Sequence, residues 1–244
     1  MCLILFAFRV HPFYPLIVAA NRDEFLERPT AAASFWSDQK EILAGRDLSA
    51  GGTWLGITRS GRFAAITNHR DLRRGRPSQP LSRGSLVLSA LKGEPDLKSA
   101  NRYDGFNLLF GNALDLRYSN NIDGSLSDVT PGIHGLSNHL LNTPWPKVLK
   151  AKTGFRAAIA AEQPEPEALF NVLLDRSIAP DEQLPDTGIG IERERALSPA
   201  FISTTGYGTR CSTVVMFGAD RRIRFEERTH EPVGLVEYLV ETKA

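Results

Sequence analysis

An unbroken apolar run near the start of the chain constrains its fold more than any other stretch. Residues 3–8 are apolar and strand-prone, and such a run predicts a strand buried inside the protein. A turn with two prolines at 11–15 and a second short apolar run at 16–20 follow. The two runs predict an antiparallel hairpin in the interior, which fixes Cys2 at the tip of its first strand.

Cys2 directly follows Met1. Removal of Met1 would give Cys2 both a thiol and a free α-amine, groups whose unperturbed pKa values are about 8.5 and about 7.7–8.0. One residue then supplies a nucleophile and its own base, as in the N-terminal threonine arrangement. With Met1 retained there is no free amine, and a free cysteine is usually a small buried hydrophobe. The sequence leaves both interpretations open.

The composition is that of an ordinary globular domain, which we place over residues 1–244 because no repeat or linker interrupts the chain. Of the 244 residues, 42% are hydrophobic and 23% are charged. The net charge of +1 gives no reason to expect a nucleic acid or a membrane surface as partner. We expect a small-molecule ligand or substrate and leave the oligomeric state open.

The sequence predicts neither export nor a membrane anchor. Arg9 interrupts the N-terminal apolar run, and no uncharged run approaches the ~18 residues of a transmembrane helix. The two cysteines, Cys2 and Cys211, lie in no metal-binding spacing. We therefore expect a reduced, cytoplasmic protein without stable membrane insertion and without a bound metal.

Short strands separated by turns recur along the chain, with helices between them. Beyond the first hairpin, the pattern predicts a hairpin of 51–58 with 62–67 and strands at 106–110, 114–118, 201–205, 212–217 and 223–227. It predicts helices at 85–92, 144–161 and 166–175, and a polar surface loop at 183–198. Strands at both ends of such a chain favour an α+β fold, in which two mostly antiparallel sheets are sandwiched between helical layers.

Polar clusters stand at the ends of several predicted strands. An Asp can accept a hydrogen bond from an α-amine, an Arg can lower a thiol pKa, and Asn side chains can hold an oxyanion. Each of these residues, taken alone, is also common in turns and helix caps. Their recurrence at several strand ends favours a catalytic or binding site. The candidates are Asn21, Arg22, Asp23, Glu24, Asn68, Ser137, Asn138 and Arg210.

The segment 70–83 is rich in arginine, proline and serine, and we interpret it as an exposed loop. Its five arginines are basic enough to meet an anionic group such as a phosphate or a carboxylate. A solvated loop without a ligand explains the same composition. The arginines are Arg70, Arg73, Arg74, Arg76 and Arg83.

Six short motifs together resemble the NRDE family, also called the transport and Golgi organisation protein 2 family. They span nearly the whole chain, and the NRDE block beside GGTWLG is the most specific of them. The motifs are Met1-Cys2, Ala20 with Asn21 to Glu24, residues 51–56, Thr67-Asn68, residues 135–138 and residues 208–210.

The same set of motifs is more distantly similar to N-terminal nucleophile hydrolases of the choloylglycine hydrolase and penicillin V acylase type. That resemblance implies an αββα fold and, less directly, the hydrolysis of an amide. The spacing between the Arg and the Asp differs from the spacing in those enzymes. The residues in comparable places, which the resemblance makes candidate catalytic residues, are Cys2, Arg22, Asp23, Asn68, Asn138 and Arg210.

The NRDE family is linked to haem trafficking and to lipid or acyl-CoA homeostasis, which implies a second class of function. Haem binding needs an axial ligand such as His and an apolar slot. His69 and His139 directly follow Asn68 and Asn138, so they could lie at the mouth of one pocket. A carrier of haem or acyl-CoA would use ligand-binding residues Asn21, Glu24, Trp54, His69 and His139. The sequence therefore leaves open a Cys2-dependent hydrolase and a non-catalytic carrier.

Overall fold

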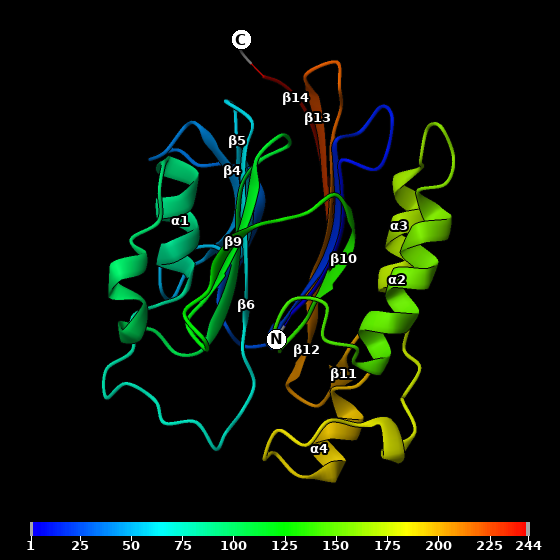
Figure 1. Ribbon diagram of the computed structural model, residues 1–244. Coiled ribbons are helices and arrows are strands. Elements are labelled where there is room, and N and C mark those ends of the chain that lie inside the picture. The colour runs from blue at the N-terminus through cyan, green and yellow to red at the C-terminus, as the bar shows by residue number, and fades with distance from the viewer. Residues whose placement is uncertain (1, 243–244) are drawn as a thin grey trace.

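Two antiparallel sheets lie face to face, and helices cover the outer face of each, as Figure 1 shows. The structure is a computed structural model that describes residues 2–242, and of Cys2 it describes the backbone alone. Every pair of neighbouring strands among these residues is antiparallel. The predicted α+β class and its layered αββα order are confirmed.

The first sheet has the strand order β10-β1-β2-β12-β13-β14, and β11 pairs with β12. Helices α2 (Pro146–Ala158) and α3 (Pro166–Leu173) cover its outer face. Its strands are β1 (Cys2–Phe8), β2 (Leu16–Phe25), β10 (Gly132–Leu136), β11 (Ser203–Thr204), β12 (Tyr207–Phe217), β13 (Arg222–His230) and β14 (Val233–Glu241).

The second sheet runs in sequence order from β3 to β9. Helix α1 (Gly84–Lys92) and the short helix η1 (Leu97–Arg102) lie on its outer side, and η2 (Asp181–Gln183) and α4 (Ile191–Ala196) belong to the connection after α3. Its strands are β3 (Thr30–Phe35), β4 (Ile42–Asp47), β5 (Leu55–Thr58), β6 (Arg62–Asn68), β7 (Phe106–Asn112), β8 (Leu116–Asn120) and β9 (Leu126–Asp128).

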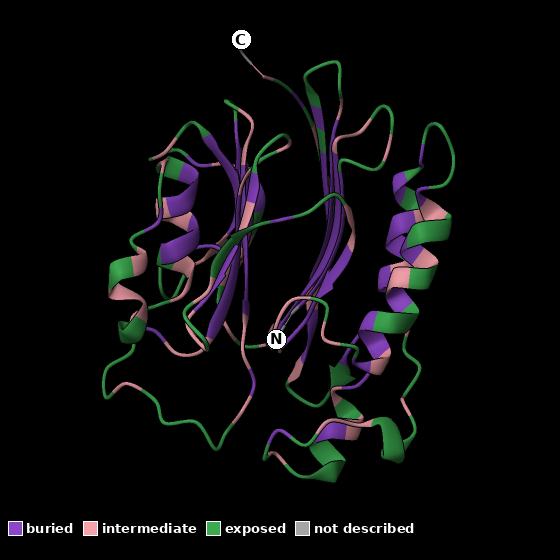
Figure 2. Cartoon of the chain, in the orientation of Figure 1, coloured by how far each residue is buried: buried purple, intermediate pink, exposed green. Residues whose placement is uncertain are grey.

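Strand β1 is buried on both faces, which explains why its sequence is continuously apolar (Figure 2). Ile4 and Phe6 belong to the core between the two sheets, whereas Leu3 and Leu5 belong to the core under α2 and α3. Burying each of these side chains contributes roughly 1.5–3 kcal/mol. The predicted hairpin of β1 and β2 is confirmed, with Leu5 opposite Ala19.

Strand β2 is longer than the apolar run at 16–20 predicted. It continues through Asn21 to Phe25, because β1 and β12 supply backbone partners on both of its sides. The four polar residues of the NRDE block therefore lie within a strand and not in a turn beyond its tip.

Several elements were not predicted, and one region was predicted wrongly. Strands β3, β4, β9, β10 and β14 and the short helices η1 and η2 were not predicted. The stretch 183–198, predicted as a surface loop, contains α4, and the segment that begins at Arg70 is not wholly exposed. Arg70 and Glu194 are buried and form an ion pair of 2.7 Å, which holds α4 against this segment.

No helix among residues 2–242 is both long and apolar enough to cross a membrane.

Candidate functional site

The start of β1 and the polar end of β2 lie side by side in the first sheet. The backbone of Cys2 is the strand partner of Arg22, and Arg22 is also the partner of Cys211 on β12. Met1 and the side chain of Cys2 lie outside the described part of the chain. The register nevertheless brings the backbone of the predicted nucleophile next to Arg22 and Asp23.

Asp23 is a buried carboxylic acid at this end of β2. Its side chain is 2% exposed, and the Thr209 hydroxyl donates a hydrogen bond of 2.7 Å to its Oδ1. Burial raises the pKa of Asp23, and the positive charge of Lys147 and the Thr209 hydrogen bond oppose that rise in part. A carboxyl group in such surroundings is suited to exchange or share a proton.

Arg22 reaches from the first sheet toward the second. It is 5% exposed, its guanidinium carbon lies 4.1 Å from the centroid of the Trp54 ring, and its Nη1 donates to the Thr30 hydroxyl over 3.2 Å. Glu24 lies 3.9 Å from Arg22 and 3.8 Å from Arg28. The cation is thus held in one place by a ring, a hydroxyl and a carboxylate.

Asn68 and Asn138 join the two sheets. Asn138, which follows β10, donates from Nδ2 to Oδ1 of Asn68 at the end of β6, over 2.9 Å. Asn138 is fully buried and accepts a hydrogen bond from the Ser137 hydroxyl, while Thr67 donates to the Ser137 carbonyl over 2.7 Å. Among the described residues, the Nδ2 of Asn68 has no hydrogen-bond acceptor, so this donor remains available.

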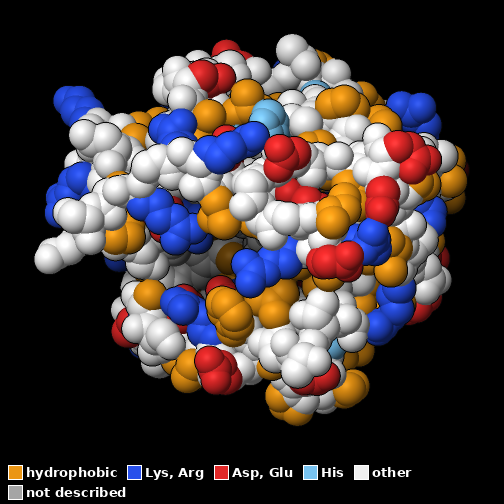
Figure 3. All heavy atoms as spheres, turned by 90° about the horizontal axis from the view of Figure 1, so that it is seen from below, with side chains coloured by type: hydrophobic (Ala, Val, Ile, Leu, Met, Phe, Trp, Pro, Cys, Tyr) orange, Lys and Arg blue, Asp and Glu red, His pale blue; other side chains and the backbone are white. Residues whose placement is uncertain are grey.

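A cavity of about 450 Å³ opens beside these residues, within the ~300–1,000 Å³ range of small-molecule sites. Arg22, Asp23, Glu24, Trp54 and Asn68 all line it. On this face of the molecule, Lys and Arg side chains gather around a hollow, as the view from below in Figure 3 shows. Five of the predicted site residues therefore meet at one cavity.

The far wall of this cavity is the start of α1, which packs tightly on the GGTWLG segment. A Cβ atom on Gly52 would come within 2.7 Å of the Gly84 backbone, so only glycine fits there. This close approach brings Thr53, Gly84 and Arg83 to the cavity opposite β2.

Asn21 and Arg210 serve other contacts in the structure. Asn21 donates from Nδ2 to the carbonyls of Leu173 and Ala200, both over 2.9 Å, which ties β2 to the end of α3 and to the segment after α4. Arg210 donates from Nη1 to the carbonyls of Phe25, Leu26 and Arg28, over 2.9, 2.7 and 3.1 Å. Neither residue lines the cavity, so both hold the strand that carries Arg22 and Asp23.

His69 and His139 lie together, with ring centroids 4.9 Å apart, as their positions after Asn68 and Asn138 led us to expect. Burial, together with the positive charges nearby, lowers the pKa of His69 to about 4, so its ring is neutral at physiological pH. His69 lines a hollow of about 170 Å³ next to the cavity, and His139 packs on Trp145 at 5.9 Å.

These two histidines do not form a site that fits haem. The hollow at His69 is smaller than the ~300–1,000 Å³ of ligand sites, and its walls are polar and charged instead of apolar. Within residues 2–242, no group of three or more His, Cys, Asp or Glu side chains is placed to hold a metal ion.

The family model described as Transport and Golgi organisation 2 matches residues 1–232 of this chain. The chain belongs to that family. It is 36% identical to the human Transport and Golgi organization protein 2 homolog, over 94% of this chain and 93% of that protein. It is 28% identical to Transport and Golgi organization protein 2 of Drosophila melanogaster, over 94% and 92%.

Among solved structures, the fold is similar to that of a conjugated bile acid hydrolase from Clostridium perfringens. The TM-score is 0.52, the sequence identity is 8%, and the match covers 98% of this chain and 92% of the hydrolase. This member of the Transport and Golgi organisation 2 family therefore has the fold of an N-terminal nucleophile hydrolase.

Sequence reasoning missed three residues of the site. Thr209, the hydrogen-bond donor to Asp23, lies inside the motif at 208–210 from which only Arg210 was chosen. Arg83 was considered only as one of five arginines of an exposed loop, which could meet an anion or be merely solvated, yet it lines the cavity and donates to the Gly105 carbonyl over 3.1 Å. Asp104 also lines the cavity, and only its position before a glycine and a strand could have signalled it.

Proposed function

We propose that this protein hydrolyses a linear amide or a related acyl bond with Cys2 as the nucleophile. One observation supports this most: the backbone register pairs Cys2 with Arg22, and Arg22 and the buried Asp23 line a cavity of ligand size. The hydrolase-like fold also supports such chemistry.

The proposed reaction has two steps, formation of a thioester on Cys2 and its hydrolysis by water. After removal of Met1, the α-amine of Cys2 accepts the thiol proton and the thiolate attacks the substrate carbonyl, forming a C–S bond. The tetrahedral intermediate collapses, the C–N bond breaks, and the proton passes to the departing amine. Water then attacks the thioester and releases the acid and the Cys2 thiol, so that amide and water become acid and amine.

The surrounding residues divide the remaining tasks. Arg22 supplies the positive charge that favours a thiolate, and Asp23 accepts a hydrogen bond from the α-amine. Asn68 offers its free Nδ2 to the oxyanion, and Asn138 positions Asn68 through its own amide. Arg210 has an indirect role, because it binds the turn after β2 and so holds the strand that carries Arg22 and Asp23.

A screen of N-acyl amides that differ in acyl length and in the charge of the amine tests this proposal, with the released amine as the readout. The wild type should release amine from at least one member, and Cys2→Ala should release none. The matched control is Cys211→Ala, which removes the other cysteine and should keep the activity. Equal release by wild type and Cys2→Ala would refute the proposal.

The second candidate is a non-catalytic carrier of haem or acyl-CoA that uses the same cavity. Support for a carrier comes from the basic side chains at the cavity, Arg22, Arg28 and Arg83, which suit the anionic groups of either ligand. The poor fit at His69 and His139 gives haem less support than acyl-CoA. A carrier would bind its ligand equally well in wild type and Cys2→Ala, measured by calorimetry or, for haem, by absorbance.

A further inference from the structure

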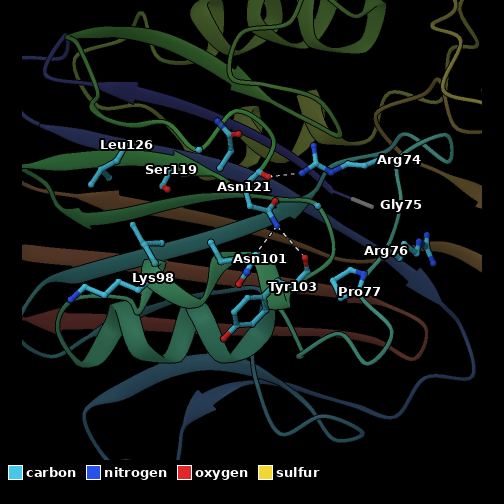
Figure 4. A pocket seen from close by; sticks show the side chains of 15 residues that line it. Arg74, Gly75, Arg76, Pro77, Lys98, Asn101, Tyr103, Ser119, Asn121 and Leu126 are labelled. Carbon is cyan, nitrogen blue, oxygen red and sulfur yellow. Dashed lines mark hydrogen bonds between the residues drawn. The ribbon is translucent and has the colours of Figure 1, made fainter.

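A second hollow, which we call the basic chamber, lies beside the arginine-rich segment 70–83 (Figure 4). Its volume is about 700 Å³, and it is walled by residues 74–77, by η1 and by the turn between β8 and β9. Arg74, Arg76 and Lys98 line it, and none of the residues that line it is an Asp or a Glu. All the charged side chains that line this hollow are therefore positive.

The floor of the basic chamber is rigid. Asn121 donates from Nδ2 to the carbonyls of Ala100 and Tyr103, over 3.0 and 3.1 Å, and accepts from the Phe106 amide over 2.8 Å. Asn120 accepts the amides of Ile122 and Asp123 in the same turn. These side chains hold η1 and the β8–β9 turn together, so the hollow is formed before any ligand arrives.

Arg74 closes one side of the chamber. Its guanidinium donates to the carbonyls of Asn121 and Ile122, over 2.8 and 3.3 Å, which fastens the arginine-rich segment to the β8–β9 turn. Within the described part of the chain, no carboxylate forms an ion pair with Arg74, Arg76 or Lys98. Neighbouring Arg73, in contrast, pairs with Asp71 over 2.9 Å. Three uncompensated cations around one hollow attract an anion.

The remaining walls are largely apolar. The side chains of Leu97, Tyr103 and Leu126 line the chamber beside the cations. We propose that the basic chamber binds an organic anion, in which a phosphate or a carboxylate is joined to an apolar or planar portion. The anionic group lies at the side of Arg74 and Arg76, and the apolar portion lies against Tyr103 and the two leucines, with Lys98 across the chamber from the two arginines (Figure 4).

The chamber adjoins the hollow at His69, which in turn adjoins the candidate site. It shares Arg74, Arg76 and Gly105 with the hollow at His69, and that hollow shares Asn68, Arg83 and Asp104 with the cavity beside β2. A ligand long enough to pass Arg74 would extend from the basic chamber toward Asn68. This extension rests on the proposed function, whereas the binding of an anion in the chamber does not.

Three naphthalene probes test the proposal by calorimetry and by amide chemical shifts: 1-naphthyl phosphate, 1-naphthoate and neutral 1-naphthol. We expect one or both anions to bind, with shifts at Gly75, Gly105, Asn121 and Gly124, and the neutral probe to bind far more weakly. The stronger of the two anions identifies the group as phosphate or carboxylate. Equal binding of all three probes, or shifts elsewhere, would overturn the proposal.

A double variant, Arg76→Gln with Lys98→Gln, should weaken binding of the anionic probe by about tenfold or more. Both side chains are exposed, so the variant should fold. The matched control, Lys40→Gln with Lys92→Gln, removes two exposed cations that do not line the chamber and should leave the affinity unchanged. An equal loss in both variants would contradict the proposal. Loss of hydrolysis in Cys2→Ala, or its absence in the wild type, has no bearing on this result.

Discussion

The amide of Asn138 donates to the side-chain oxygen of Asn68 over 2.9 Å and so joins the ends of two strands that belong to different sheets. Asn138 is fully buried, while Asn68 reaches the cavity. The bond uses only the side-chain oxygen of Asn68 and leaves its amide nitrogen as a hydrogen-bond donor. The geometry of the candidate oxyanion donor thus depends on a residue that does not line the cavity.

Replacing Asn138 with Asp therefore should affect both stability and activity. The substitution keeps the shape but places an acceptor against the Oδ1 of Asn68, which should lower the free energy of unfolding by about 1–3 kcal/mol. Urea denaturation measures this. Gln163→Glu, the same chemical change at an exposed residue, is the control and should be nearly neutral. A neutral result for Asn138→Asp would show that the bond between the sheets contributes little.

Asp23 should make the folded protein less stable as the pH rises. Burial raises its pKa above the ordinary value of 3.8, so the folded state favours the protonated acid. Its stabilising effect is complete below the unfolded value and is lost as the pH rises through the folded pKa. Asp23→Asn should therefore be more stable than the wild type at neutral pH, yet lose hydrolytic activity.

Unfolding of both forms measured from below pH 3.8 to neutrality tests this expectation. The difference in unfolding free energy should grow with pH in favour of the variant. A constant difference would mean that the carboxyl of Asp23 titrates alike in the folded and unfolded states.

Arg210 should be important chiefly for structure. Its Nη1 binds three backbone carbonyls in the turn after β2, and hydrogen bonds from a charged donor contribute roughly 1.5–3 kcal/mol. Arg210→Gln should lower the free energy of unfolding by that amount, and Arg102→Gln, at an exposed arginine, should not. A large fall in kcat at unchanged stability would instead assign Arg210 a direct role in the reaction.

The buried pair of Arg70 and Glu194 should contribute far more than the exposed pairs near it. Both side chains are nearly inaccessible, and Glu194 also accepts from the amide and hydroxyl of Thr187, over 2.8 and 2.5 Å. Glu194→Gln removes the buried carboxylate that pairs with the Arg70 charge, which should cost about 3–5 kcal/mol. Asp186→Asn, which breaks an exposed pair with Arg73, should cost under about 1 kcal/mol.

Local pattern was enough to predict the hairpin of β1 and β2, the helices α1, α2 and α3, and the layered class. It was not enough for α4, whose turns are polar. Glu194 is buried there only because Arg70 lies opposite, 124 residues away in the chain. Strand β14 was not predicted because its apolar residues do not alternate regularly with polar ones, and most of its residues are exposed or half-exposed.

The candidate site, too, could be predicted only in part from local sequence. Arg22, Asp23 and Asn68 could be chosen from their places at strand ends, and they do line one cavity. That Asn21 and Arg210 bind backbone carbonyls depends on the approach of α3 and of the turn after β2, which no local pattern reveals. Thr209 is important through a hydrogen bond between β12 and β2, which also depends on long-range strand pairing.

The intact mass of the protein purified from its own cell tests the proposed chemistry most directly. The Cys2 mechanism requires a chain that begins at Cys2, because only then does the residue have a free α-amine to take the thiol proton. We predict that Met1 is absent. A chain that retains Met1 in full would contradict catalysis by Cys2 and would leave the carrier as the function to pursue.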